Sequence, residues 1–145
     1  MMNKKIDHIA IAVNNIEESA KLFEKILNVA ASKTEIIKSE KVKTKFFHLN
    51  DSKIELIEGT DQNSTVAKFV KKKGEGIHHI AIEVDDIQNE IKRLKKLGFN
   101  TIKNTVSEGA NGKLISFLYP KDTNGVLIEL CQKRSEEHTS ELQSP

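Results

Sequence analysis

A nine-residue phrase occurs once in each half of the chain, and this internal repeat limits the folds that are open to it. The stretch "KIDHIAIAV" spans residues 5–13, and "GIHHIAIEV" follows it by seventy-one residues, at 76–84. In both copies Ile and Val alternate with other residues, which predicts a β-strand. A chain that repeats at a fixed offset contains two copies of one structural unit. We therefore expect two similar modules, each opening on a strand that carries a histidine.

The same order of elements follows each copy of the phrase. An amphipathic helix comes next, capped by Asn or Asp, and three further strands complete the module. The sequence thus predicts an α+β fold of two paired βαβββ modules whose concave faces form one cleft. The modules span about residues 4–60 and 76–132, with a linker helix at about 64–73. The expected strands are 6–13, 33–39, 42–49 and 53–58 in the first module, and 77–84, 100–105, 113–119 and 126–132 in the second.

Length and ending suggest one domain with a separate tail. A chain of 145 residues can bury one core, and we assign the domain to residues 1–133. The stretch "RSEEHTSELQSP", residues 134–145, has no periodicity and few apolar residues. It is predicted to be disordered or non-native, so His138 is left out of the search for metal ligands.

Composition excludes several classes of partner. The formal net charge of +2 argues against nucleic acid as a partner. Apolar runs are only as long as strands, so no membrane span is expected. A single cysteine, Cys131, fits a reducing compartment. Because the first residues also lack the pattern of a targeting segment, we expect a cytoplasmic protein.

Strand alternation directs four polar side chains to one side of the strands. Successive side chains point to opposite faces, so His8 and His79 lie opposite the aliphatics that pack on the helices. Glu55 in "KIELIE" and Glu129 in "VLIELC" hold matching positions and point the same way. Buried charge is costly unless it is paired or bound to metal. Two imidazoles and two carboxylates therefore predict a divalent ion: cobalt, manganese, nickel or zinc.

Two other histidines and one glycine-rich loop receive different interpretations. His78 points to the helix side by the same alternation, so a structural role is predicted for it. His48 has no counterpart in the repeat and is predicted to lie on the surface. "EGANG" at 108–112 is expected to form a mobile loop over the cleft, or a plain turn between strands.

The chain resembles the glyoxalase-like, vicinal-oxygen-chelate superfamily and, within it, the methylmalonyl-CoA epimerase family. The resemblance covers residues 6–132. The superfamily as a whole shares "DHIAIAV", whereas the longer blocks are more specific to the epimerase family. The matching stretches are "DHIAIAV", "IELIE", "STVAKFVKKKGEGIHHIAIEVDDI", "EGANGK" and "FLYPKDTNGVLIEL".

The resemblance implies a ligand set and an activity. His8, Glu55, His79 and Glu129 would ligate the metal, although members often carry Gln where Glu55 stands. The activity is interconversion of (R)- and (S)-methylmalonyl-CoA by α-proton removal, with the enolate stabilised by the metal. Glu129 is the first choice for the catalytic base and Glu55 for its counterpart on the opposite side. Some members place a catalytic Glu where this chain has Thr44, which cannot act as a carboxylate base.

Partners and alternative functions also follow from this reading. The expected substrate is an acyl-CoA whose phosphates lie near lysines, and the resemblance suggests a homodimer. One alternative is a glyoxalase I-like lyase with the same ligand set. Arg93 is the only Arg before the tail, which leaves little to clamp a glutathione carboxylate. The other alternative is a metal-free small-molecule-binding protein of this fold, which would have no need of four converging ligands.

Overall fold

The computed structural model describes residues 4–134, so the expected tail lies outside the described residues except for Arg134. The described chain forms two compact units. The first unit comprises residues 6–81, and the second comprises residues 4–5 and 82–134. The boundary falls inside a strand, β5, so most of the strand that opens the second module belongs to the first unit. None of the helices in residues 4–134 is long and apolar enough to cross a membrane.

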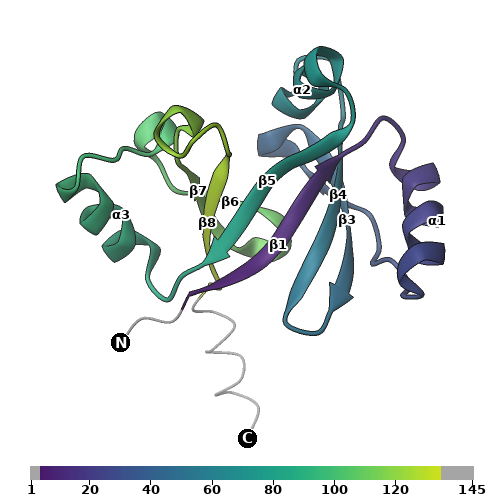
Figure 1. The fold of residues 1–145 in the computed structure, drawn as a ribbon, viewed down its shortest axis with the longest axis horizontal. Helices are drawn as coiled ribbons and strands as arrows, with labels where there is room; N and C mark the ends of the chain where they lie inside the picture. Colours follow the sequence, from purple (N-terminus) through teal and green to yellow (C-terminus); the bar gives the residue numbers. More distant parts are fainter. Residues whose placement is uncertain (1–3, 135–145) are drawn as a thin grey trace, which may run out of the picture. The chain divides into compact units, whose positions relative to one another are not determined.

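The first unit is a sheet with two helices (Figure 1). Its strands lie in the order β2-β3-β4-β1-β5. β1 runs parallel to β4, and β3 runs antiparallel to both β2 and β4. The elements are β1 (Lys5–Ala12), α1 (Ile16–Leu27), β2 (Glu35–Ile37), β3 (Val42–Leu49), β4 (Ser52–Gly59), α2 (Thr65–Lys73) and β5 (Gly76–Glu83).

Helix α1 begins and ends where its sequence supplies capping groups. The Asn15 side chain accepts a hydrogen bond from the backbone N–H of Glu18 at 3.0 Å, which satisfies one of the free donors of the first turn. At the other end Asn28 takes a left-handed conformation with φ 56°, a role that Asn fills when Gly is absent. The helix expected from the sequence is thereby confirmed.

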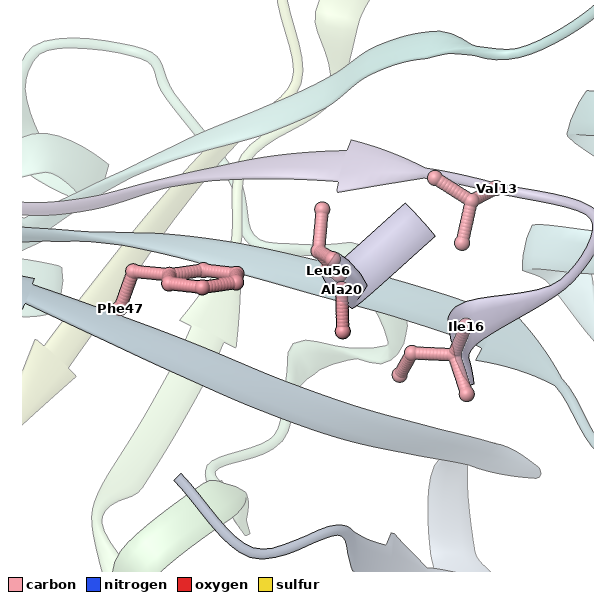
Figure 2. Close-up of a cluster of buried hydrophobic side chains, with 5 residues drawn as sticks. All are labelled: Val13, Ile16, Ala20, Phe47 and Leu56. Atoms are coloured by element: carbon pink, nitrogen blue, oxygen red, sulfur yellow. The ribbon is translucent and has the colours of Figure 1, made fainter. Parts of the chain in front are cut away.

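The core of the first unit confirms the predicted strand faces. Figure 2 shows five buried side chains, which α1, β3, β4 and the segment after β1 contribute. Phe47 and Leu56 are fully buried, and each such side chain contributes about 1.5–3 kcal/mol when removed from water. Ile11 and Ile54 pack against the same cluster. The five buried residues are Val13, Ile16, Ala20, Phe47 and Leu56.

The second unit also packs a capped helix against a sheet. The Asp86 side chain caps α3 by accepting from the backbone N–H of Asn89 at 3.0 Å. Val84, Ile87 and Leu130 form its buried core. The strands β8, β7 and β6 are neighbours in that order and antiparallel. The elements are α3 (Ile87–Lys96), β6 (Ser107–Glu108), β7 (Leu114–Phe117) and β8 (Ile128–Gln132).

Two of the expected strands differ from the prediction. The prediction of a strand at 100–105 is wrong, because a 3-10 turn occupies Ile102–Asn104 and Thr101 makes only an isolated bridge. Lys103 and Asn104 have φ of 62° and 56°, values that a strand cannot contain. The strand expected at 33–39 is shorter, since the 3-10 turn Lys38–Glu40 is needed to reverse the chain into β3.

A buried carboxylate ties α3 to the start of the chain. Glu90 is only 2% exposed. Arg93 donates to its two oxygens at 3.3 and 2.8 Å, and the Lys4 ammonium lies 3.4 Å from Oε2. The hydrogen bond from Arg93 lowers the pKa of the Glu90 carboxyl, burial opposes this, and Lys4 lowers it further.

Replacing Glu90 with Gln should lower the free energy of unfolding at about pH 7 by about 1 kcal/mol, because a buried charge-assisted hydrogen bond is lost. A lowered folded-state pKa means that this stabilisation is complete above the unfolded-state pKa and disappears as pH falls through the folded-state value. Urea unfolding at about pH 7 and about pH 3 measures both effects. Glu17→Gln, in the exposed first turn of α1, is the matched control. A penalty of equal size at both pH values would contradict this assignment.

Candidate metal centre

His8 and Glu55 share one face of the first unit, opposite its hydrophobic core. In the register between β1 and β4, Ala10 pairs with Glu55, and paired residues project from the same face. His8 is two residues from Ala10 and therefore shares that face. Ala10 itself is completely buried, and its small side chain leaves room beside the two polar groups. Phe46 pairs with Glu55 from the other side and meets the His8 ring edge-on at 5.7 Å.

Three of the four predicted ligands converge within the first unit. Oε1 of Glu55 lies 3.1 Å from Nε2 of His8 and 3.7 Å from Nε2 of His79. The two Nε2 atoms are 3.3 Å apart, and all three residues are 5–6% exposed. Ligand atoms at about 2.1 Å from one ion stand about 3.0 Å apart in an octahedron and 3.4 Å apart in a tetrahedron. The observed separations fit a single ion.

The chemistry of these atoms also fits a cation. Nδ1 of His8 lies 2.7 Å from the Asp7 carboxylate, and Nδ1 of His79 lies 2.9 Å from Nδ1 of His78. A neutral imidazole that donates from Nδ1 has a lone pair on Nε2. If both ligand rings donate from Nδ1, the two Nε2 lone pairs and a carboxylate oxygen point at one spot, and they repel one another unless a cation lies between them.

Glu129, the fourth predicted ligand, belongs to the second unit. It lies in β8 opposite Phe117 of β7 and is 5% exposed. Its neighbour Leu130 is part of the core on the helix side, so alternation directs the Glu129 carboxylate to the other face. This agrees with the predicted face. Ligation of the same ion by Glu129 stays a prediction.

The buried hydroxyl of Thr44 is a candidate ligand-binding group, a role that the sequence did not indicate. Thr44 is 1% exposed, and its Oγ1 has no hydrogen-bond partner among residues 4–134. It pairs with Ile57 and so shares the face of Glu55. Leaving a buried hydroxyl unpaired costs about 1–3 kcal/mol, which favours a role toward a ligand. In the second unit, Oε1 of Glu83 is likewise buried without a partner in the described chain.

The other histidines occupy the places that the sequence predicts. His48 is exposed on β3, as expected of a surface residue. His78 packs edge-on against Phe69 of α2, with ring centroids 4.9 Å apart. A structural role was predicted for it, but its bond to His79 was not. Asp7 was missed altogether, although it precedes His8 just as His78 precedes His79.

The glycine-rich stretch at 108–112 forms a turn in the second unit. β6 ends at Glu108, and a 3-10 turn covers Ala110–Gly112. A Cβ added to Gly109 would lie 2.9 Å from the Ile115 side chain, so a larger residue there would require Ile115 to shift. The expected movement of this loop over a ligand stays a prediction.

Comparison with known proteins identifies the family of the chain and several similar proteins. The model of the glyoxalase/bleomycin resistance protein/dioxygenase superfamily matches residues 7–117. The human mitochondrial methylmalonyl-CoA epimerase is 38% identical over 129 residues, which are 88% of this chain and 73% of the human protein. The ethylmalonyl-CoA/methylmalonyl-CoA epimerase of Cereibacter sphaeroides is 36% identical over 130 residues, covering 88% of this chain and 97% of the relative.

A solved structure agrees with these relatives. It is a methylmalonyl-CoA epimerase in complex with methylmalonyl-CoA and NH4+. Its TM-score to this chain is 0.87 at 30% sequence identity, and the match covers 91% of this chain and 96% of that one. The similarity thus extends over nearly the whole described chain.

Proposed function

Because this chain belongs to the glyoxalase/bleomycin resistance protein/dioxygenase superfamily, we propose that it interconverts (R)- and (S)-methylmalonyl-CoA. The observation that carries the proposal is the similarity, over 88% of the chain, to two epimerases that act on this thioester by name. The related structure with bound methylmalonyl-CoA supports an acyl-CoA as the substrate. The converging donors of His8, Glu55 and His79 supply the chemistry that such a reaction needs.

His8, Glu55, His79 and, as a fourth ligand, Glu129 are the residues proposed to hold a divalent ion. When bound, the ion would supply positive charge that stabilises the negative charge developing on the substrate as the proton leaves. Mixed imidazole and carboxylate donors suit cobalt, manganese, nickel or zinc.

Glu129 and Glu55 are proposed to move the proton. A carboxylate oxygen on one side of the substrate takes the α-hydrogen as the C–H bond breaks, and an acid on the other side returns a proton to the same carbon. Glu129 is assigned the first of these steps. Glu55 is the weaker candidate for the second. Because a carboxylate bound to metal is a poorer base, either residue would have to be loosely held by the ion or act through water.

Thr44 is proposed to bind the substrate rather than to act as a base. A hydroxyl does not ionise near neutral pH, but it donates one hydrogen bond and accepts others. Its buried Oγ1, which has no partner within residues 4–134, can donate to a substrate oxygen on the face that carries Glu55. The resemblance implies a Glu at this position in some members of the superfamily, so this chain would need another residue as its second proton donor.

The proposal predicts exchange with solvent during turnover. Protein reconstituted with cobalt or zinc and given methylmalonyl-CoA in deuterated water should replace the α-hydrogen by deuterium while the epimers interconvert. Exchange is expected because a protonated carboxylate can trade its proton with water before the return step. Proton NMR measures the loss of the α-hydrogen signal, and chelator-treated protein is the control.

The same preparation separates the alternatives. Metal-loaded protein that gives neither exchange nor epimerisation would contradict the proposal. Turnover of the methylglyoxal–glutathione hemithioacetal by that protein would instead support the glyoxalase I-like lyase.

A further inference from the structure

We propose that Asp7 and His78 are positioning residues for the two histidine ligands, and that Asp7 holds its ligand more strongly than His78 does. The inference rests on the metal site of the proposed function but not on the reaction. Each of the two residues immediately precedes a ligand, and each contacts the ring nitrogen of that ligand on the side away from Glu55. Their positions are related by the same offset as His8 and His79.

Asp7 gives His8 a charged partner. Its Oδ2 lies 2.7 Å from Nδ1 of His8, and Asp7 is 4% exposed. Neighbouring residues of a strand normally point to opposite faces, so this contact is not a default of strand geometry. A carboxylate that accepts from Nδ1 fixes the tautomer with its lone pair on Nε2, sets the ring orientation and raises the basicity of the ligand.

Lys53 and Phe46 hold the Asp7–His8 pair in place. The Lys53 ammonium is 3.4 Å from the same Oδ2 of Asp7, so the buried carboxylate has a counter-charge. Lys53 also lies 5.3 Å from the centre of the Phe46 ring, and that ring contacts the His8 ring. Each member of this group therefore restricts another, and the His8 imidazole has little freedom to turn.

His78 gives His79 a neutral partner. The two Nδ1 atoms are 2.9 Å apart, and such a bond needs a hydrogen on one nitrogen and a lone pair on the other. If Nε2 of His79 is the ligand atom, its Nδ1 carries the hydrogen and His78 accepts. The edge-on contact of His78 with Phe69 fixes the accepting ring against α2.

His8 and His79 hold equivalent positions in the repeat, but the hydrogen bonds that hold their rings differ in strength. A hydrogen bond to an ionised acceptor is roughly twice as strong as one between neutral groups. Asp7 should therefore contribute more to the basicity and orientation of its ligand than His78 does. Residues in this position relative to a ligand are typically worth about 10–100-fold in metal affinity. We assign the upper part of that range to Asp7 and the lower part to His78.

Titration of the full-length, metal-free protein with Co²⁺ alone tests this, with a competing chelating dye for affinity and the visible absorption of bound Co²⁺ for geometry. Asp7→Ala should weaken binding by about 30–100-fold and change the spectrum, and His78→Ala should weaken it by about 10-fold. His78→Asn should restore much of the loss, because its side-chain oxygen can accept in place of Nδ1. Asp51→Ala and His48→Ala, at exposed positions, are the matched controls and should bind as the wild type does.

Several results would overturn the inference. Asp7→Ala binding within about twofold of the wild type, with an unchanged spectrum, removes Asp7 from this role. A larger loss in His78→Ala than in Asp7→Ala reverses the order and refutes the assignment. Should Asp7→Ala fail to fold, Asp7→Asn is the substitute, because it keeps an acceptor without the charge. Asp7→Asn should bind Co²⁺ more weakly than the wild type, and binding within about twofold of the wild type would remove the charge of Asp7 from this role.

Failure of the metal site and failure of the proposed reaction can be told apart. Wild-type protein that binds no Co²⁺ would refute the positioning roles together with the metal site. Normal Co²⁺ binding without hydrogen exchange would refute only the proposed reaction, and the effects of Asp7 and His78 on affinity would still be measurable.

Discussion

Replacing Glu129 with Gln should abolish hydrogen exchange and epimerisation together. Both rates should fall by about 100–10,000-fold. The amide cannot accept the α-proton, and it is also a weaker metal ligand than a carboxylate. Exchange of the α-hydrogen, followed by NMR in deuterated water, and the rate of epimer interconversion report the same lost step. The assay is made at a metal concentration that saturates the variant, so that weaker metal binding does not imitate a loss of chemistry.

Glu55→Gln is the matched control, because it makes the same change in the same position of the other module. The resemblance to relatives with Gln at this position leads us to expect a milder effect, with metal still bound, and a milder effect would show that Glu55 is not the second acid. If Glu55→Gln proves as inactive as Glu129→Gln, both carboxylates take part in proton transfer. Full activity in Glu129→Gln would remove that residue from the mechanism.

Replacing His79 with Ala should strip the metal from the protein while leaving the fold largely intact. His79 supplies one of the three donor atoms that lie within 3.7 Å of one another. Loss of a ligand should cost more than the 10–100-fold that is typical of residues that only orient ligands. The change also removes one of the converging lone pairs. The repulsion that is relieved offsets part of the stability lost with the packing of the ring.

Metal content after gel filtration measures the effect, and far-ultraviolet circular dichroism with a thermal melt checks the fold. His48→Ala, which replaces an exposed histidine, should keep its metal. A His79→Ala protein that retains one ion per chain would show that the ion is bound elsewhere.

The repeat made much of the fold predictable. Because side chains alternate strictly along a strand, the position of Ile11 and Ile54 in the core was sufficient to place His8 and Glu55 on the other face. Helix limits were also readable, since Asn15 and Asp86 carry the capping groups. Turns were harder to predict. The prediction of a strand at 100–105 was wrong because Lys103 and Asn104 adopt left-handed conformations, which the spacing of apolar residues does not reveal.

The contacts around the ligands could not be predicted in the same way. Period-two reasoning places Asp7 and His8 on opposite faces, so it gives no reason to expect a hydrogen bond of 2.7 Å between them. The unpaired state of the Thr44 hydroxyl depends on everything packed around it, which one sequence position does not encode. Glu129 was placed on a face by the repeat, but its part in the metal site rests on the assays described above.

The parallel pairing of β1 with β4 has a consequence for the order of events as the chain folds. β3 and β4 form a hairpin whose contacts are local, whereas β1 reaches β4 only after the intervening helix and strands have been enclosed. Closing the longer loop carries the greater entropic cost, so it is expected later. His8 and Glu55 are therefore expected to meet late, so an ion held by both of them would bind only after the hairpin has formed.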